Sequence, residues 1–136
     1  MTLPINNLNE LLRTMTPYLN EGIYLFATVE PDTAIPLLEI ISSIQEQEGL
    51  SIVVSEQTAQ KYQLNAQFRA AWITLTVHSD LAAVGLTAAF AAALGQAQIS
   101  CNVVAGNYHD HIFVPYEQAD LAMSVLKKLQ QDAAIK

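Results

Sequence analysis

The sequence predicts an α+β fold, and three observations support this prediction. Residues 68–131 have the pattern of a strand, a helix, two strands and a second helix. The first half repeats an outline of long strand, helix and strand. Hydrophobic residues make up 51% of the 136 positions and charged residues only 14%, against a typical share of about 25%, which favours a packed globular protein. One more strand would complete the second half as a ferredoxin-like βαββαβ sandwich, so we expect a tandem, duplicated arrangement with an irregular first half.

Composition and charge exclude several classes of protein. The single cysteine, Cys101, excludes an intrachain disulfide scaffold and a zinc site built from several cysteines. The formal net charge of −7 argues against nucleic acid or an anionic membrane as a partner. The first twenty residues lack the features of a signal peptide, and the apolar run over 81–94 is too short to span a membrane, so we expect a cytoplasmic protein.

The predicted elements of the first half begin with a short amphipathic helix that Pro17 ends. Its apolar positions at helical spacing are Leu8, Leu11, Leu12 and Met15. Gly22 then opens a strand over residues 22–29, which is rich in aromatic and β-branched residues.

A second helix is expected over residues 35–48, with Pro36 in its first turn and Gly49 as its stop. Its apolar stripe would consist of Leu37, Ile40, Ile41 and Ile44. A short apolar strand over residues 50–55 and a short helix over residues 56–64 complete the first half. We place this first domain at residues 1–66 and the second at residues 67–136.

The second half has clearer signals. A strand over residues 68–78 puts Trp72, Thr74 and Thr76 on one face, and Ser79 or Asp80 is a natural N-cap for a helix over residues 81–95. A hairpin of strands over 99–105 and 109–114 follows, and a helix runs from Pro115 to about residue 131. The buried face of this helix would be Ala119, Ala122, Val125, Leu126 and Leu129. We expect the missing strand of this unit to come from the first half, or a neighbouring sheet to cover its edge.

The segment ITLTVHSDLAAVGLTAAFAAALGQAQISCNVVAG resembles an ACT domain. That family has a strand, a short acidic loop, a helix of small apolar residues and an Ile–Ser/Asn entry to the next strand. Asp80, Leu81 and Gly85 stand at the loop and first turn, and Ile99 begins the second strand. Together with GIYLFATVEP and CNVVAGNYHDHIFVP, the segment is similar to a small bacterial family of stand-alone tandem ACT-like proteins, for which amino-acid binding is predicted. One departure is that the proline–glycine pair usual after the loop Asp is absent here.

The resemblance implies a free amino acid as ligand, and the chemistry of the loop agrees with it. A helix N-terminus offers free N–H groups to a carboxylate, and Asp80 could bind an ammonium group. The alternative is a plain N-cap. The predicted ligand-binding residues are His78, Ser79, Asp80, Leu81, Val84, Gly85, Leu86, Cys101 and Asn102, with Asn107, His109 and His111 as secondary candidates.

The histidines and the cysteine raise two further alternatives. His109 and His111 alternate on one strand and His78 ends another, so three imidazoles could converge on a metal if those strands are neighbours. We favour a hydrogen-bonding hairpin rim or a second wall of the amino-acid pocket, and predict no metal and no cofactor. Cys101 could act as a nucleophile with a histidine, but in a strand without charges a buried thiol behaves as a small hydrophobe.

These features predict a regulatory protein that binds a free amino acid and is not an enzyme. The sequence has no G-x-S-x-G element, no phosphate-binding loop and no dinucleotide fingerprint. No charged residue occurs from Leu81 to His109, and the helix predicted over residues 81–95 consists largely of small side chains. Both features favour intrachain packing on one face of that helix and a homodimer contact on another. The alternative is a structural or interaction module that forms a homo-oligomer without a small ligand. The charge of −6 on residues 1–66 is interpreted as a solvated surface rather than a site for a cationic ligand such as lysine.

Overall fold

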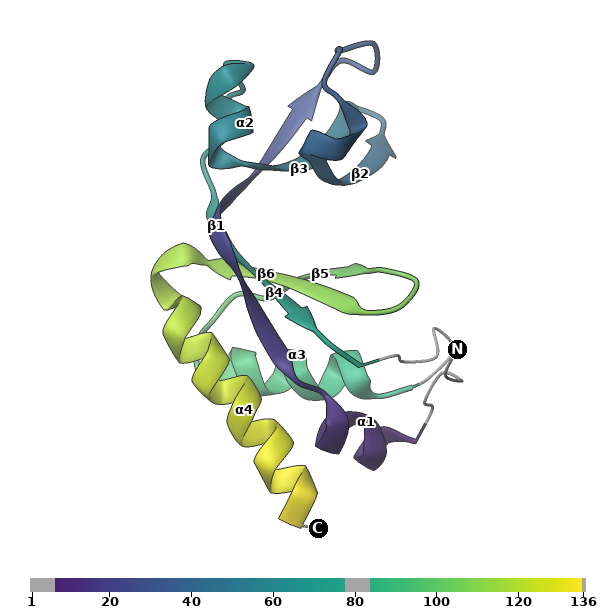
Figure 1. Ribbon diagram of the computed structural model, residues 1–136, viewed down its shortest axis with the longest axis vertical. Helices are drawn as coiled ribbons and strands as arrows, with labels where there is room; N and C mark the ends of the chain where they lie inside the picture. The colour runs from purple at the N-terminus through teal and green to yellow at the C-terminus, as the bar shows by residue number, and fades with distance from the viewer. Residues whose placement is uncertain (1–6, 78–83, 136) are drawn as a thin grey trace.

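A computed structural model describes residues 7–77 and 84–135 of the protein (Figure 1). The elements of the first half are α1 (Leu8–Thr14), β1 (Pro17–Val29), the 3₁₀ helix η1 (Leu37–Glu39), β2 (Ile40–Glu46), β3 (Gly49–Ser55) and α2 (Glu56–Lys61). Those of the second half are β4 (Arg69–Leu75), α3 (Leu86–Gln96), β5 (Asn102–Ala105), β6 (Asp110–Pro115), the 3₁₀ helix η2 (Tyr116–Gln118) and α4 (Ala119–Ile135).

All six described strands form one antiparallel sheet in the order β2-β3-β1-β4-β6-β5. The 13-residue β1 holds the two halves together, because its second part pairs with β3 and its first part pairs with β4 (Figure 1). The register of β1 against β4 shifts between Asn20 and Tyr24, and Gly22 takes a positive φ of 106° inside this bulge. The bulge bends β1 from one half of the sheet into the other.

The second half confirms the predicted ferredoxin-like unit. Its elements β4, α3, β5, β6 and α4 follow the expected order, and β1 pairs with the free edge of β4. The first half therefore supplies the missing strand, as predicted. Strand β4 serves in turn as the last strand of the unit β1-β2-β3-α2. The two units share β1 and β4, so they form one continuous structure.

The helix predicted over residues 35–48 is wrong. The chain forms only the short η1 and then β2, which pairs with β3 from Ile40↔Val54 to Glu46↔Gly49. The spacing of the apolar residues in this segment fits a strand with a bulge as well as it fits a helix. The β-branched isoleucines of the segment favour the strand. Pairing with the buried β3 decides between the two, and no α-helix precedes β2 in this part of the described chain.

The other predictions need smaller corrections. The first strand begins at Pro17, five residues earlier than predicted, and the helix predicted from residue 81 begins at Leu86 with Gly85 as its N-cap. The predicted N-caps Ser79 and Asp80 lie outside the described residues. Strand β5 begins at Asn102 rather than residue 99, and α4 extends to Ile135. The predicted buried face of α4 is confirmed for Ala119, Ala122 and Leu126, while Val125 and Leu129 are partly buried and packed against the core.

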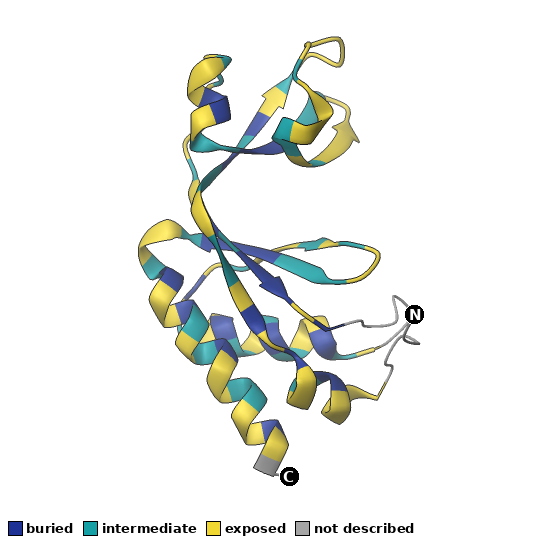
Figure 2. Ribbon diagram, viewed as in Figure 1, coloured by how far each residue is buried: buried dark blue, intermediate teal, exposed yellow. Residues whose placement is uncertain are grey.

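One face of the sheet carries the helices and the two larger parts of the core (Figure 2). In the second half, α1, α3 and α4 cover Ala71, Ile73, Leu75, Ile112 and Val114. In the first half, α2 covers Leu25, Ala27, Ile52 and Val54. The opposite face, which we call the bare face, carries a third cluster of Val53, Ala70 and Phe113 with Tyr24, Phe26, Phe68, Trp72 and Val104. The strand alternation separates the clusters, because odd and even positions of β1 and β4 point to opposite faces.

Among the described residues, none of the helices is long and apolar enough to cross a membrane.

Candidate functional site

The predicted ligand loop leads into α3. His78, Ser79, Asp80 and Leu81 lie outside the described residues, so their part of the site stays a prediction. Of the rest, Val84 is 85% exposed and Leu86 is buried in the core beneath the sheet. Gly85 lies between them at the start of the helix.

The N-cap of α3 is Gly85, which has no side chain with which to cap the helix. Its φ is +106°, a conformation that glycine adopts without strain, and among the described residues no side chain accepts from the first turn of the helix. The N-terminal end of α3 is also closely packed, because a Cβ atom on Gly85 would lie 3.0 Å from Cδ2 of Leu8 in α1. The amide groups of a helix N-terminus can bind an anion, and the backbone conformation of Gly85 sets the direction in which the first amide groups of α3 point.

Cys101 and Asn102 face different surroundings. Cys101 packs against the helix-covered core, and burial raises the pKa of its thiol, which favours the unreactive protonated form. Asn102 pairs with Phe113 across the β5–β6 ladder, and its Nδ2 donates to the carbonyl of Phe113 at 3.2 Å. Since Phe113 belongs to the bare face, Asn102 shares that face. The structure does not bring the Cys101 and Asn102 side chains together.

The secondary candidates also separate. Asn107 is exposed in the turn between β5 and β6. His109 Nδ1 lies 3.1 Å from the carbonyl oxygen of Val77, to which it can donate, while His111 lies among side chains of the bare face. Within residues 7–77 and 84–135 no group of three or more His, Cys, Asp and Glu is placed to hold a metal. Convergence with His78 is not tested, because His78 lies outside the described residues.

A polar network on the bare face contains three residues that sequence analysis did not propose as a site. Asn20 Nδ2 donates to the carbonyl oxygen of Trp72 at 3.1 Å and to Oγ1 of Thr74 at 3.0 Å. Thr74 Oγ1 lies 3.1 Å from Nδ1 of His111, and Trp72 Nε1 donates to the same nitrogen at 3.0 Å. The shared face of Trp72 and Thr74 is visible in the sequence, but their connection to Asn20 and His111 needs the pairing of β1, β4 and β6.

This network determines the protonation of His111. The indole nitrogen of Trp72 is a donor only, so Nδ1 of His111 must accept and Nε2 carries the proton of the neutral ring. Burial and, to a smaller extent, His109 lower the pKa of His111, while Asp110 opposes them. The imidazole is therefore held as a neutral hydrogen-bonding group, with its Nε2–H directed away from Trp72.

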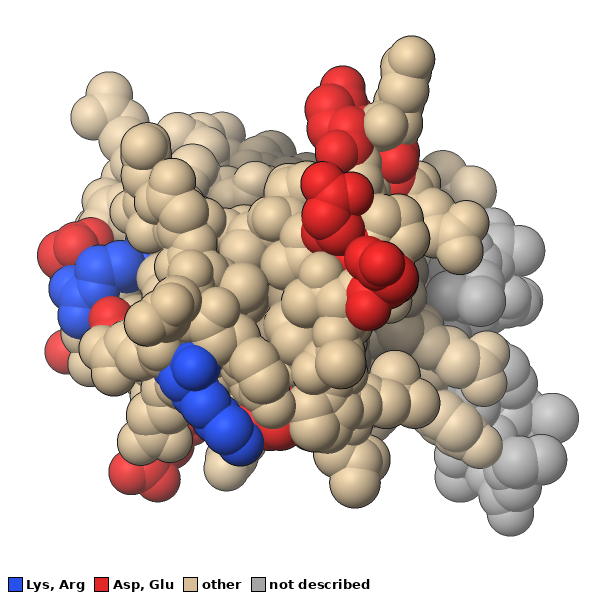
Figure 3. All heavy atoms as spheres, turned by 90° about the horizontal axis from the view of Figure 1, so that it is seen from above, with Lys and Arg blue, Asp and Glu red and all other residues tan. Residues whose placement is uncertain are grey.

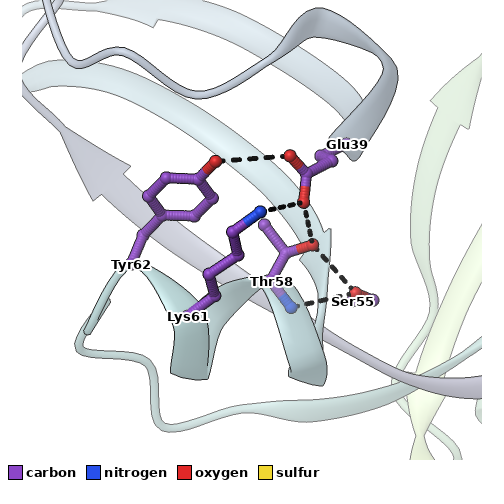
Figure 4. Close-up of polar contacts among 5 residues, drawn as sticks. All are labelled: Glu39, Ser55, Thr58, Lys61 and Tyr62. Carbon is purple, nitrogen blue, oxygen red and sulfur yellow. Dashed lines mark hydrogen bonds and ion pairs between the residues drawn. The ribbon is translucent and has the colours of Figure 1, made fainter.

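A second polar cluster ties η1 to α2 (Figure 4). Glu39 accepts from Tyr62 Oη at 3.3 Å and from Thr58 Oγ1 at 3.4 Å, and Lys61 Nζ lies 3.8 Å from its Oε1. Ser55 caps α2 by accepting from the Thr58 amide at 3.1 Å. The hydrogen bonds link side chains within the protein, so we interpret the cluster as structural.

The acidic character of the first half appears on its surface. Figure 3, seen from above, shows a band of Asp and Glu side chains with no Lys or Arg beside it, and further Asp and Glu side chains at the left and lower edges, nearer to Lys and Arg. Glu30, Asp32, Glu46 and Glu48 are exposed in or next to the turns that follow β1 and β2. Exposed carboxylates of this kind agree with the predicted solvated surface.

Comparison with known proteins gives a consistent family. Two family models, both described as an ACT domain, match residues 4–71 and residues 67–128. No curated protein matches the sequence. A solved structure from Vibrio cholerae, of a protein of unknown function described as a possible transport protein, is 44% identical with a TM-score of 0.78. The match covers 90% of this chain and 95% of that chain.

More distant structures share the fold. An Agrobacterium tumefaciens protein is 18% identical with a TM-score of 0.67, over 85% of this chain and 89% of its own. The ligand-free regulatory subunit of aspartate kinase from Thermus thermophilus is 10% identical with a TM-score of 0.59, over 85% of this chain and 98% of its own. These two matches concern the arrangement of strands and helices alone. With family models matching both halves, the chain belongs to the ACT-domain family and is a tandem pair of ACT domains.

Proposed function

We propose that this protein is a regulatory module that binds a free amino acid at the N-terminal end of α3 and has no catalytic activity of its own. The observation that carries the proposal is the first turn of α3, which follows the positive φ of Gly85 and has no side-chain cap among the described residues, in a chain that belongs to the ACT-domain family. Its amide groups would bind the α-carboxylate, and Asp80, in the preceding loop of the sequence, would bind the α-ammonium group.

The shared sheet supplies a route for regulation. Because β1 and β4 belong to both ACT units, a change at the start of α3 reaches the first half through packed side chains rather than a flexible linker. Binding would act by favouring one of two arrangements of the chain or of its assembly. Cys101 and His111 support a non-catalytic role. Burial favours the protonated form of the Cys101 thiol, and Nδ1 of the neutral His111 ring is engaged as the acceptor for Trp72.

The direct test is a thermal-shift screen of the twenty amino acids with the full chain. A ligand at 100 times its Kd should raise the free energy of unfolding by about 2.7 kcal/mol. Asp80→Asn should weaken that ligand at least tenfold, because the ammonium group loses its counter-charge. Asp132→Asn, on the exposed side of α4, is the matched control and should leave the affinity unchanged. Absence of a shift with every amino acid would refute the proposal.

We also propose that the protein is a cytoplasmic homodimer that uses the exposed side of α3 as its contact. Thr87, Ala88 and Ala92 are exposed there, and their small uncharged side chains allow close approach of a second helix. Ala92→Glu should convert the dimer into a monomer in sedimentation experiments, whereas Ala134→Glu on α4 should not. A monomeric native chain would contradict this assembly. A stable dimer with no amino-acid response would support the alternative, a structural interaction module.

A further inference from the structure

The bare face of the sheet contains a cavity of about 260 Å³ between the two edge strands. Strands β2 and β5 stand at opposite ends of the strand order, yet both contribute to its wall because the sheet curls strongly on this side. The lining residues are Ile40, Ile41 and Ser42 of β2, Trp72 of β4, Val104 of β5, and His111 and Phe113 of β6. The cavity and the start of α3 lie on opposite faces of the sheet, since Leu86 belongs to the helix-covered core.

The wall of the cavity suits a flat apolar molecule. Trp72 and Phe113 stack nearly parallel, with ring centroids 6.2 Å apart and an interplanar angle of 21°. Tyr24 packs edge-on against Trp72 at 5.2 Å and holds the indole in place. The volume is slightly below the range of about 300–1,000 Å³ typical of pockets for drug-sized ligands, so its occupant is small, of one or two fused rings.

The polar groups of the wall select against a charged occupant. None of the described residues that line the cavity is Asp, Glu, Lys or Arg, so the carboxylate and ammonium groups of a free amino acid would have no counter-charge from them. His111 supplies a neutral donor instead, because Trp72 occupies Nδ1 and leaves the proton on Nε2. Among the described residues Nε2 of His111 has no hydrogen-bond partner, and a Cβ on Gly106 would lie 3.2 Å from it. A ligand atom that reaches His111 must therefore be an acceptor.

We propose that this cavity binds a small uncharged heteroaromatic molecule, which packs against Trp72 and Phe113 and accepts a hydrogen bond from Nε2 of His111. The site and its ligand class are independent of the amino-acid site proposed at α3. The lowered pKa of His111 supports the assignment, since it keeps the ring neutral at physiological pH. Ser42 adds a hydroxyl group at the opposite wall, on β2.

The experiment uses two probe molecules of nearly equal shape. Quinoline is uncharged at neutral pH and has one ring nitrogen acceptor, whereas naphthalene has none. Trp72 is the only tryptophan of the chain, so its single indole N–H resonance in a ¹H–¹⁵N NMR spectrum reports on this cavity. We expect quinoline to shift that resonance saturably and to bind about 2- to 10-fold more tightly than naphthalene, the value of one net hydrogen bond. Equal affinities, or no shift of the Trp72 resonance, would overturn the proposal.

Two neighbouring serines provide matched variants. Ser42 pairs with Val53 and faces the cavity, while Ser43 pairs with Ile52 and faces the other side of β2. Both positions lie on an edge strand, and phenylalanine is a residue type that is enriched in strands. Ser42→Phe should fill the cavity and weaken quinoline at least tenfold, and Ser43→Phe should change it less than twofold. Equal losses in the two variants would show that quinoline binds elsewhere.

Two further measurements separate this site from the amino-acid site. His111→Phe should abolish the preference for quinoline over naphthalene while both still bind, because packing remains and the donor is lost. Asp80→Asn should leave quinoline binding unchanged whether or not an amino acid binds at α3. Free tryptophan should not bind in the cavity and should therefore not shift the Trp72 resonance. If free tryptophan does shift it, and Ser42→Phe removes that shift, the proposal of an uncharged ligand is wrong.

Discussion

The indole Nε1 of Trp72 donates a hydrogen bond to Nδ1 of His111 at 3.0 Å. Together with the contact of Thr74 Oγ1 to the same nitrogen, this bond joins β4 to β6 through their side chains, and it specifies which nitrogen of the imidazole carries the proton. Protonation of Nδ1 would turn the acceptor into a donor and break the bond. The contact therefore couples the charge of His111 to the packing of the bare face.

We predict that stability falls as the pH is lowered through about 6.5, the ordinary pKa of histidine. The folded pKa of His111 is lowered by burial and by His109, with Asp110 acting against them, so below 6.5 the unfolded chain binds more protons than the folded one. The loss should level off below the folded pKa. Urea unfolding at a series of pH values measures this slope.

His111→Gln is the control for this slope, because a glutamine oxygen can still accept from Trp72 but does not titrate. The pH dependence below 6.5 should shrink in the variant, and an unchanged slope would contradict the assignment to His111.

Asp110 acts with the opposite sign at lower pH. Burial raises the pKa of Asp110 above its ordinary value of 3.8, so the folded chain binds the proton more tightly than the unfolded chain. The stability that this gives is lost as the pH rises from 3.8 through the folded pKa, and Asp110→Asn should remove this pH dependence.

Two glycines should respond to alanine in opposite directions. Gly49 has a φ of +147°, and a Cβ there would lie 2.8 Å from the carbonyl oxygen of Val29. Gly49→Ala should lower the free energy of unfolding by about 1–3 kcal/mol, because backbone strain and a clash with main-chain atoms add. Gly95 lies in α3 with open space around it, so Gly95→Ala should stabilise by about 0.5–1 kcal/mol. Equal effects in chemical denaturation would contradict the geometry.

The Glu39 cluster predicts an uneven set of losses. Glu39→Ala removes the acceptor for Thr58 and Tyr62 and should cost about 1–2 kcal/mol of stability. Lys61→Ala should cost less than about 0.5 kcal/mol, because the Lys61 side chain is 63% exposed and its ion pair is long. Glu46→Ala, at an exposed position of β2, should also stay within about 0.5 kcal/mol. Faster amide exchange in η1 and α2 of Glu39→Ala alone would support the tie between them.

Helix α4 offers a matched pair of leucines. Leu126 is fully buried against the sheet, and Leu121 is 48% exposed on the same helix. Leu126→Ala should lower the free energy of unfolding by about 2–5 kcal/mol, and Leu121→Ala should cost less than about 1 kcal/mol. Similar losses at both positions in thermal and urea unfolding would contradict the packing of α4 on this face.

The predictions from sequence succeeded where local pattern and tertiary packing agree. Alternation over Arg69–Leu75 and the apolar stripe of α4 each have one favourable arrangement, and both are confirmed. They failed over Leu37–Glu46, where two leucines and three isoleucines fit either a helix or a bulged strand. Local periodicity cannot separate those two structures, because the deciding hydrogen bonds run to β3 rather than along the segment.

The candidate sites divide along a similar line. The ACT resemblance and the helix that ends near Gly95 were accessible from the sequence, since both depend on residues close together in the chain, although that helix begins at Leu86 rather than at the predicted residue 81. Asn20, Thr74 and His111 are separated by more than thirty residues from one another, and their distances of 3.0–3.1 Å follow from the register of β1, β4 and β6. No spacing in the sequence encodes that register.

Composition, apolar spacing and the family motif by themselves determined that this chain is an α+β tandem ACT protein with an uncharged segment from Leu81 to His109. Only the tertiary structure decided that both units share β1 and β4, that the segment before β3 is a strand, and that a cavity lies on the bare face. The physical reason is that local propensities are summed over neighbouring residues, while strand pairing and burial join residues across the whole chain.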